Sequence, residues 1–170
     1  PISREFEQCH FKACDFTELE LHQVKFLACT FETCNLSNVK LEKSSFQDCT
    51  FAQCKMLGLA FDNCNPFNLS MQFKECILSH ASFSGLNLTQ CGFDQCDLTG
   101  VDFGYCDLTQ AKLTNCNMTD TLFEQTILQK ADMRDSINYQ IDPDNNTIKG
   151  ARFSKEEIIG LLAKYQIIIE

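Results

Sequence analysis

The sequence has no run of 18 apolar residues, which excludes a transmembrane helix of ordinary length. Its N-terminus has no charged segment followed by an apolar one, so a secretory signal is not expected. Basic residues are scarce, with 14 Lys and Arg against 23 Asp and Glu, and the net charge is −9. This balance disfavours direct binding to nucleic acid or to an anionic membrane. We therefore expect a soluble, cytoplasmic protein whose acidity serves either a basic partner or solubility alone.

Motifs of catalysis and cofactor binding are also absent from the sequence. No G-x-S-x-G, P-loop or G-x-G-x-x-G occurs, and the three histidines have no neighbouring nucleophile. Residues 142–146 alternate Asp and Asn like the start of a calcium loop. However, Thr147 and Phe153 stand where such a loop needs its glycine and its glutamate. We expect no enzymatic activity, no cofactor and no metal site.

A large apolar residue stands at every fifth position over most of the chain. The first series is Phe6, Phe11, Phe16, Leu21, Phe26, Phe31, Leu36, Leu41, Phe46, Phe51, Met56 and Phe61. The second is Phe73, Leu78, Phe83, Leu88, Phe93, Leu98, Phe103, Leu108, Leu113, Met118, Phe123, Leu128 and Met133. A period of five fits neither an α-helix nor a β-strand. It indicates a solenoid whose coils stack on one another.

The 12 cysteines indicate how many sides each coil has. They stand two residues before the apolar centres, and their pattern repeats every 20 residues, which is four pentapeptides per coil. Between Phe61 and Phe73 the repeat contains two extra residues. When they are allowed for, one position of the 20-residue repeat is cysteine in six successive coils: Cys14, Cys34, Cys54, Cys76, Cys96 and Cys116. Cysteine packs as a small buried hydrophobe. Strands about 4.8 Å apart hold the Cβ atoms too far apart for a disulfide, so we expect reduced thiols inside the solenoid.

These repeats resemble those of pentapeptide-repeat proteins. The matching segments are Cys14–Glu18, Cys34–Asn38, Cys96–Gly100 and Cys106–Gln110. The resemblance implies an all-β solenoid: a right-handed quadrilateral parallel β-helix over residues 1–153, with a loop near 138–147. The repeat is interrupted near 65–71, and the residues of this interruption are Asn65, Pro66, Phe67 and Asn68.

The last residues, 154–170, predict a C-terminal α-helix followed by a short strand. Ser154 and Glu157 match a capping box. The helix is too short to be stable alone, so its apolar face is expected to cap the last coil and to form a homodimer. The candidate interface residues are Ile158, Ile159, Leu161, Leu162, Tyr165, Ile167 and Ile169.

This ending resembles that of the Qnr-type quinolone-resistance proteins. That resemblance implies a rod-shaped acidic mimic of DNA that binds DNA gyrase and topoisomerase IV and protects them from quinolones. The long side loops of many Qnr proteins have no counterpart here beyond the two extra residues between Phe61 and Phe73. The candidate acidic surface is Glu75, Asp94, Asp97, Asp102 and Asp107, in a stretch with no Lys or Arg between Glu75 and Lys112. The alternative is a scaffold or immunity-type protein that binds an unrelated protein partner.

Overall fold

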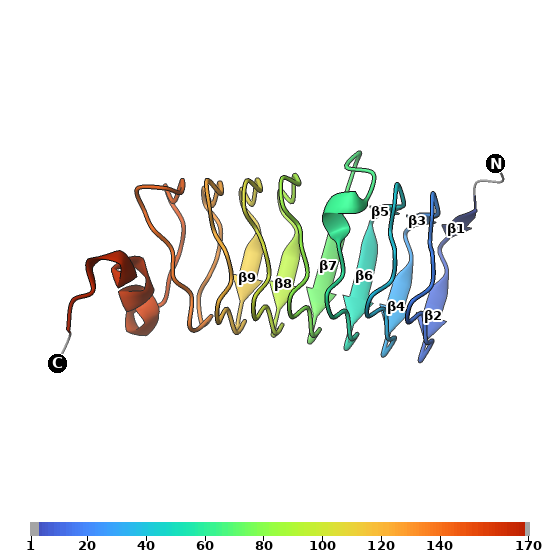
Figure 1. Ribbon diagram of the computed structural model, residues 1–170, viewed down its shortest axis with the longest axis horizontal. Helices are drawn as coiled ribbons and strands as arrows, with labels where there is room; N and C mark the ends of the chain where they lie inside the picture. Colours follow the sequence, from blue (N-terminus) through green and yellow to red (C-terminus); the bar gives the residue numbers. More distant parts are fainter. Residues whose placement is uncertain (1–3, 169–170) are drawn as a thin grey trace.

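Short parallel strands stacked in register form the body of the molecule (Figure 1). The computed structural model describes residues 4–168. One sheet has the order β1-β3-β5, and the other has the order β2-β4-β6-β7-β8-β9. The strands are β1 (Glu5–Glu7), β2 (His10–Lys12), β3 (Lys25–Leu27), β4 (Thr30–Glu32), β5 (Ser45–Gln47), β6 (Cys49–Ala52), β7 (Met71–Lys74), β8 (Gly92–Asp94) and β9 (Lys112–Thr114). Three 3₁₀ helices complete the fold: η1 (Phe61–Asn63), η2 (Lys155–Leu161) and η3 (Ala163–Tyr165).

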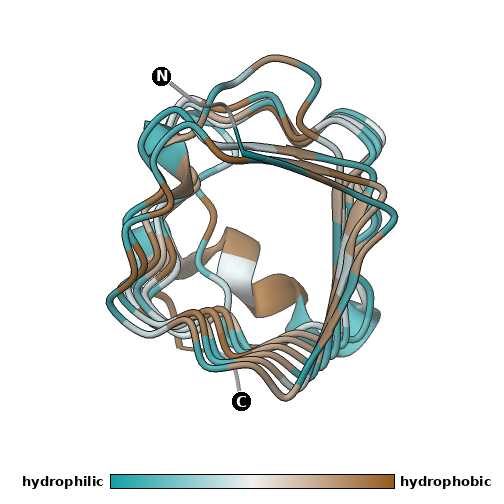
Figure 2. Ribbon diagram, turned by 90° about the vertical axis from the view of Figure 1, so that its right-hand side faces the viewer, coloured by the Kyte–Doolittle hydropathy of each residue, from teal (hydrophilic) through white to brown (hydrophobic). Residues whose placement is uncertain are grey.

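Each coil of the solenoid has four sides, as the view along the stack shows (Figure 2). Side 1 (4–8, 24–28, 44–48, 64–70, 86–90, 106–110, 126–130 and 146–150) carries the sheet β1-β3-β5, and side 2 (9–13, 29–33, 49–53, 71–75, 91–95, 111–115, 131–135 and 151–154) carries the longer sheet. Side 3 (14–18, 34–38, 54–58, 76–80, 96–100, 116–120 and 136–140) and side 4 (19–23, 39–43, 59–63, 81–85, 101–105, 121–125 and 141–145) are joined by single bridges. Partners lie 20 residues apart, as in Phe6↔Phe26 and Asp97↔Asn117. The predicted parallel β-solenoid is confirmed.

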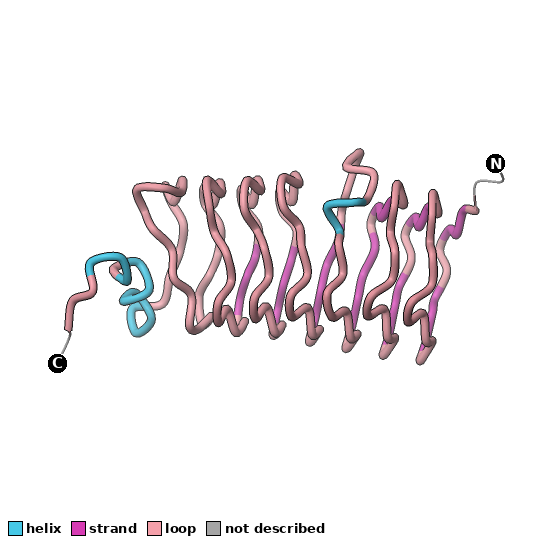
Figure 3. The backbone as a smooth tube through the Cα atoms, in the orientation of Figure 1, coloured by secondary structure: helices cyan, strands magenta, loops and turns pink. Residues whose placement is uncertain are grey.

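The five-residue period follows from the geometry of one side. The apolar centre points inward, and the phenylalanines form stacked ladders, for example Phe31 on Phe51 with ring centroids 4.8 Å apart. Two residues after each centre the chain turns a corner in the left-handed region, at φ values such as 53° for Thr33 and 58° for Asn38. Such corners leave most of each coil outside regular strands (Figure 3). A side therefore needs an inward centre, a corner residue two positions after it and three further positions.

The position two residues before the centre is also inward, and its residues donate hydrogen bonds. The Cys54 thiol donates to the carbonyl oxygen of Phe31 at 3.4 Å, and the Thr126 hydroxyl donates to that of Phe103 at 2.9 Å. Each of these bonds joins residues 23 apart, so it links one coil to the next. Ten of the 12 cysteines are buried, as their spacing predicts. Small donors in this column fill the corner and add a side-chain hydrogen bond to a carbonyl oxygen of the preceding coil; that of Phe103 also accepts from the Cys106 N–H at 3.1 Å.

The interruption lies on side 1. Across it the ladder partners are 22 residues apart, as in Lys55↔Ile77. Residues 65–70 leave the sheet as a loop that projects beyond the other coils (Figure 1). Phe67 in this loop is 67% exposed. Sheet β1-β3-β5 therefore ends at β5, while side 2 continues without a gap.

The C-terminal segment differs from its prediction. It forms η2 and η3 instead of an α-helix, and Ser154 makes no side-chain capping bond. The Ser154 hydroxyl accepts a hydrogen bond from the Asp135 N–H at 2.8 Å and donates to its carboxylate at 3.1 Å, so the capping box is wrong. No strand forms over 166–168, and Ile169 lies outside the described residues. Docking on the preceding coil, not local helix propensity, sets this segment's shape.

Candidate functional site

The five acidic residues predicted to form one surface lie on different sides. Glu75 and Asp94 are on side 2, Asp97 on side 3, Asp102 on side 4 and Asp107 on side 1. The solenoid brings Glu75 and Asp94 together on successive coils, where the Glu75 N–H donates to the Asp94 carbonyl oxygen at 2.9 Å, and it spreads the other three over the remaining sides. Their closeness in sequence is misleading because five residues carry the chain from one side of the coil to the next.

Several of these carboxylates also have a structural task. Asp97 accepts hydrogen bonds from the Thr99 N–H at 3.0 Å and from the Ser79 hydroxyl at 3.0 Å. Asp102 and Asp107 accept in the same way from the N–H two residues further on, at 2.7 and 2.9 Å. The Asn115 amide beside Asp94 holds the pKa of that carboxyl below its usual value. An Asp before the centre thus stabilises its own turn, which explains its frequency in the repeat.

The acidity of the molecule is concentrated on two adjacent sides. Side 4 carries seven acidic residues and only two basic ones, Lys40 and Lys43. The seven are Glu20, Glu42, Asp62, Asp102, Glu124, Asp142 and Asp144. Side 3 carries four acidic residues, Asp15, Glu18, Asp97 and Asp120, against Lys55 alone. Sides 1 and 2 each hold equal numbers of acidic and basic residues, so the negative charge faces one half of the rod.

This density is comparable to that of one DNA strand. Seven rows of side 4 stacked at about 4.8 Å span about 30 Å. One strand of B-DNA places about nine phosphates over that length, at about 3.4 Å each. Sides 3 and 4 together place 11 carboxylates on the same length. The sequence contains this arrangement, but it becomes visible only when the acids are sorted by their position in the 20-residue register.

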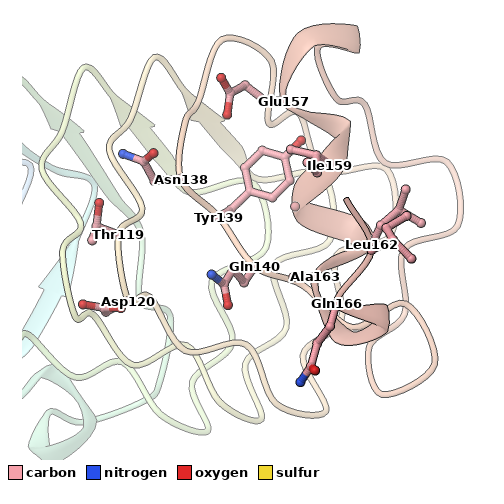
Figure 4. A pocket seen from close by; sticks show the side chains of 12 residues that line it. Thr119, Asp120, Asn138, Tyr139, Gln140, Glu157, Ile159, Leu162, Ala163 and Gln166 are labelled. Carbon is pink, nitrogen blue, oxygen red and sulfur yellow. The ribbon is translucent and has the colours of Figure 1, made fainter. Parts of the chain in front are cut away.

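The C-terminal segment exposes the apolar residues expected at a dimer interface. Ile158, Ile159, Tyr165 and Ile167 are each about half exposed, whereas Leu161 and Leu162 are partly buried. A pocket of about 540 Å³ separates this segment from the last coils (Figure 4). Ile159, Leu162 and Ile167 line one wall, and the polar residues Thr119, Asp120, Asn138 and Gln140 line the other.

Tyr139 connects this pocket to the solenoid core. Its side chain is 2% exposed, and its hydroxyl has no hydrogen-bond partner within residues 4–168. Burial, assisted by the charge of Glu157, raises the pKa of Tyr139 to about 12. Gly160 of η2 lies directly against it, and the Gly160 carbonyl accepts a bond from the Ile141 N–H at 3.0 Å. This contact holds η2 on the last coil.

The cysteines of the described part of the chain are used in packing, and several of its charged residues form ion pairs. No group of three or more His, Cys, Asp or Glu residues within 4–168 could hold a metal ion. Burial raises the pKa of the Cys49, Cys64 and Cys106 thiols to about 12, which keeps them protonated. Lys164 binds the carboxylates of Asp142 and Asp144, the first at 2.7 Å. Among these residues, no helix has the length and apolarity that a membrane span needs.

Comparisons with known proteins identify the repeat. The family model described as "Pentapeptide repeat region" matches residues 4–83 and 68–153. In fold the chain is similar to two trypsin-treated variants of QnrB1, described as a plasmid-mediated fluoroquinolone resistance protein. The first has a TM-score of 0.73 at 18% identity and covers 98% of this chain and 90% of that one. The second has a TM-score of 0.70 at 17% identity and covers 98% and 92%. No curated protein matches in sequence. With the family model spanning nearly the whole solenoid, this chain belongs to the pentapeptide repeat family.

Proposed function

We propose that this protein is a non-enzymatic, acidic mimic of DNA that binds a type II topoisomerase, DNA gyrase or topoisomerase IV. The observation that carries the proposal is the charge of sides 3 and 4, which hold 11 acidic residues against three basic ones. A protein surface that binds DNA is basic and recognises the phosphate backbone. A rod with matching negative charge can occupy the same surface without being cleaved. Protection of the enzyme from quinolones follows if the rod excludes the DNA on which the drug acts.

The solenoid makes the charge pattern rigid. The acids of sides 3 and 4 stand on ladders of backbone hydrogen bonds, so their spacing is fixed by the coil separation. Binding therefore needs little ordering of the acidic surface, which favours affinity. The similarity of fold to QnrB1, a fluoroquinolone resistance protein, is consistent with this use of the rod.

We further propose that two copies associate through the C-terminal segment. Ile158, Ile159, Tyr165 and Ile167 leave an apolar surface at the end of the rod. Contiguous exposed apolar surface of this kind is typical of an interaction site. The experiment is the mass in solution of the chain and of its Leu162→Asp variant. A dimer that becomes a monomer in the variant supports the proposal, and two monomers refute it.

Binding to the topoisomerase is tested by charge removal on one side. Asp62→Asn with Glu124→Gln removes two carboxylates from side 4 without changing side-chain shape. Glu7→Gln with Asp48→Asn removes two from side 1 and is the matched control. With purified gyrase at low salt, the side 4 variant should bind and inhibit supercoiling more weakly than the control. The wild-type affinity should fall as salt rises, because opposite charges steer the association. Equal binding by both variants, or no binding at micromolar protein, would refute the proposal.

A further inference from the structure

A second pocket lies where the interruption breaks the sheet of side 1. Its volume is about 660 Å³, within the usual range for small-molecule sites. Gln23, Lys25, Lys43 and Ser45 line it from the lower coils, and residues 64–66 line it from the next coil. Lys25 and Ser45 are register partners on the outer face of β3 and β5. The pocket therefore exists because the loop leaves the sheet after β5.

Both charged residues of this pocket are lysines. Lys25 lies 4.0 Å from Glu5, but both side chains are more than half exposed, so this pair binds Lys25 only weakly. Lys43 forms no ion pair within residues 4–168. No carboxylate lines the pocket, although the chain as a whole has a net charge of −9. The pocket is thus a local concentration of positive charge on an acidic protein.

The other polar groups at the pocket are unused hydrogen-bond donors. Ser45 is only 5% exposed, and its hydroxyl makes no hydrogen bond to any residue in 4–168. The N–H of Phe46, next to it, has no backbone acceptor in the same range because no strand follows β5. The Ser45 hydroxyl lines the pocket and is not sealed inside the protein, so it can donate directly to a ligand that accepts hydrogen bonds.

The walls of the pocket are fixed before any ligand binds. The Asn65 N–H donates to the Ser44 carbonyl oxygen at 2.7 Å, and the Phe67 N–H donates to the Asn65 side chain at 3.0 Å. Burial raises the pKa of Cys64 to about 12, so this thiol is protonated and a poor nucleophile. The site is preorganised for reversible binding rather than for covalent chemistry.

We propose that this pocket binds a small molecule bearing an oxyanion, either a phosphate ester or a carboxylate. The ammonium groups of Lys25 and Lys43 would neutralise its charge, and the Ser45 hydroxyl with the Gln23 and Asn65 amides would donate to its oxygens. The apolar flank of the ligand would rest on Pro66. This proposal is independent of the acidic sides 3 and 4.

The test is an NMR titration of the full chain with inorganic phosphate and, separately, with succinate at constant ionic strength. We expect saturable shifts of the Phe46 N–H and of the Gln23 and Asn65 side-chain amides with at least one anion. Which anion saturates at the lower concentration identifies the ligand class. In Lys25→Gln with Lys43→Gln the affinity should fall at least about tenfold, since two attractive charges are lost. The matched control, Lys55→Gln with Lys74→Gln, removes two lysines from sides 3 and 2 and should retain the affinity.

Two outcomes would overturn this proposal. One is the absence of saturation with both anions in the wild-type chain. The other is equal affinity in the Lys25/Lys43 variant, which would make the shifts an effect of diffuse charge. Unchanged spectra of both variants away from the pocket show that they are folded, so a loss of binding is not mistaken for unfolding.

Discussion

Gly160→Ala tests the docking of the C-terminal segment on the solenoid. A Cβ atom at Gly160 would lie 2.2 Å from the Tyr139 carbonyl oxygen and 2.7 Å from its ring. Ordinary contact distances are longer by about 1 Å, and backbone cannot yield as a flexible side chain does. We expect η2 to shift away, at an overpacking cost of about 1–3 kcal/mol, with loss of the bond between Ile141 and Gly160.

Amide hydrogen exchange at Ile141 measures this loss directly. Its N–H is protected by the Gly160 carbonyl oxygen, so undocking of η2 exposes it. A cost of about 1–3 kcal/mol corresponds to about 5- to 150-fold faster exchange. Gly104→Ala is the control, because a Cβ atom there would lie 3.0 Å from a side-chain oxygen of Asp102 and 3.9 Å from the nearest backbone atom. Unchanged exchange at Ile141 in Gly160→Ala would refute the close packing of η2 on Tyr139.

Three further outcomes follow from the repeat geometry. Thr33→Gly should raise the free energy of unfolding by about 1 kcal/mol, because Thr33 has a φ of 53° that β-branched residues resist. The denaturation midpoint should rise with it, and a lower midpoint would contradict this. Thr126→Val should cost about 0.5–1.5 kcal/mol by removing the hydroxyl's bond to the Phe103 carbonyl oxygen, which keeps its bond from the Cys106 N–H, and Thr126→Cys, with the donor typical of this column, should cost less; equal losses would argue against the bond. Hydrogen bonds from Arg134 to Asp132 and from Lys164 to Asp142 hold both carboxyl pKa values below 3.8. Their stabilisation is therefore complete above about pH 4 and lost as pH falls through the lowered values, which acid titration of the NMR signals should show.

The repeated part of the molecule could be predicted from the sequence because one constraint acts on every coil. An inward centre at each fifth position and a small residue two before it are enough to assign the ladders from Phe11 to Leu113. The register also predicts which cysteines are buried. The pattern did not reveal that these cysteines donate to carbonyl oxygens of the neighbouring coil, since a period of apolar residues does not distinguish a thiol from a methyl group.

The C-terminal segment was predicted less well because its shape depends on contacts that no period encodes. Ser154 and Glu157 match a capping box, yet Ser154 bonds to Asp135 of the previous coil. Gly160 lowers helix propensity but is required by the close approach to Tyr139. At position 138 the repeat places Asn where earlier coils of side 3 have Phe, Leu or Met, and Tyr139 fills the core instead.

The candidate acidic surface winds around the rod. Asp97, Asp102 and Asp107 follow one another at intervals of five residues, so they occupy three successive sides of the solenoid. Residues that share one side are about 20 apart, such as Asp102 and the residues above and below it on side 4. In a solenoid, the charges of one surface are found by comparing residues that occupy the same position in successive coils.

Comparing columns also shows where the excess negative charge lies, since sides 3 and 4 hold 11 acidic residues and three basic ones whereas sides 1 and 2 hold equal numbers. On side 2, acids meet bases across or within coils, as in Lys12 with Glu32 at 2.9 Å and Arg134 with Asp132 at 2.7 Å. On side 4, Lys40 pairs with Glu20 at 2.7 Å and Lys164 binds Asp142 and Asp144. Asp62, Asp102 and Glu124 form no ion pair within residues 4–168. Paired charges cancel within a few ångströms, whereas unpaired ones act over about a Debye length, roughly 8–10 Å. The unpaired carboxylates of side 4 are therefore the residues whose removal should weaken a basic partner's binding most.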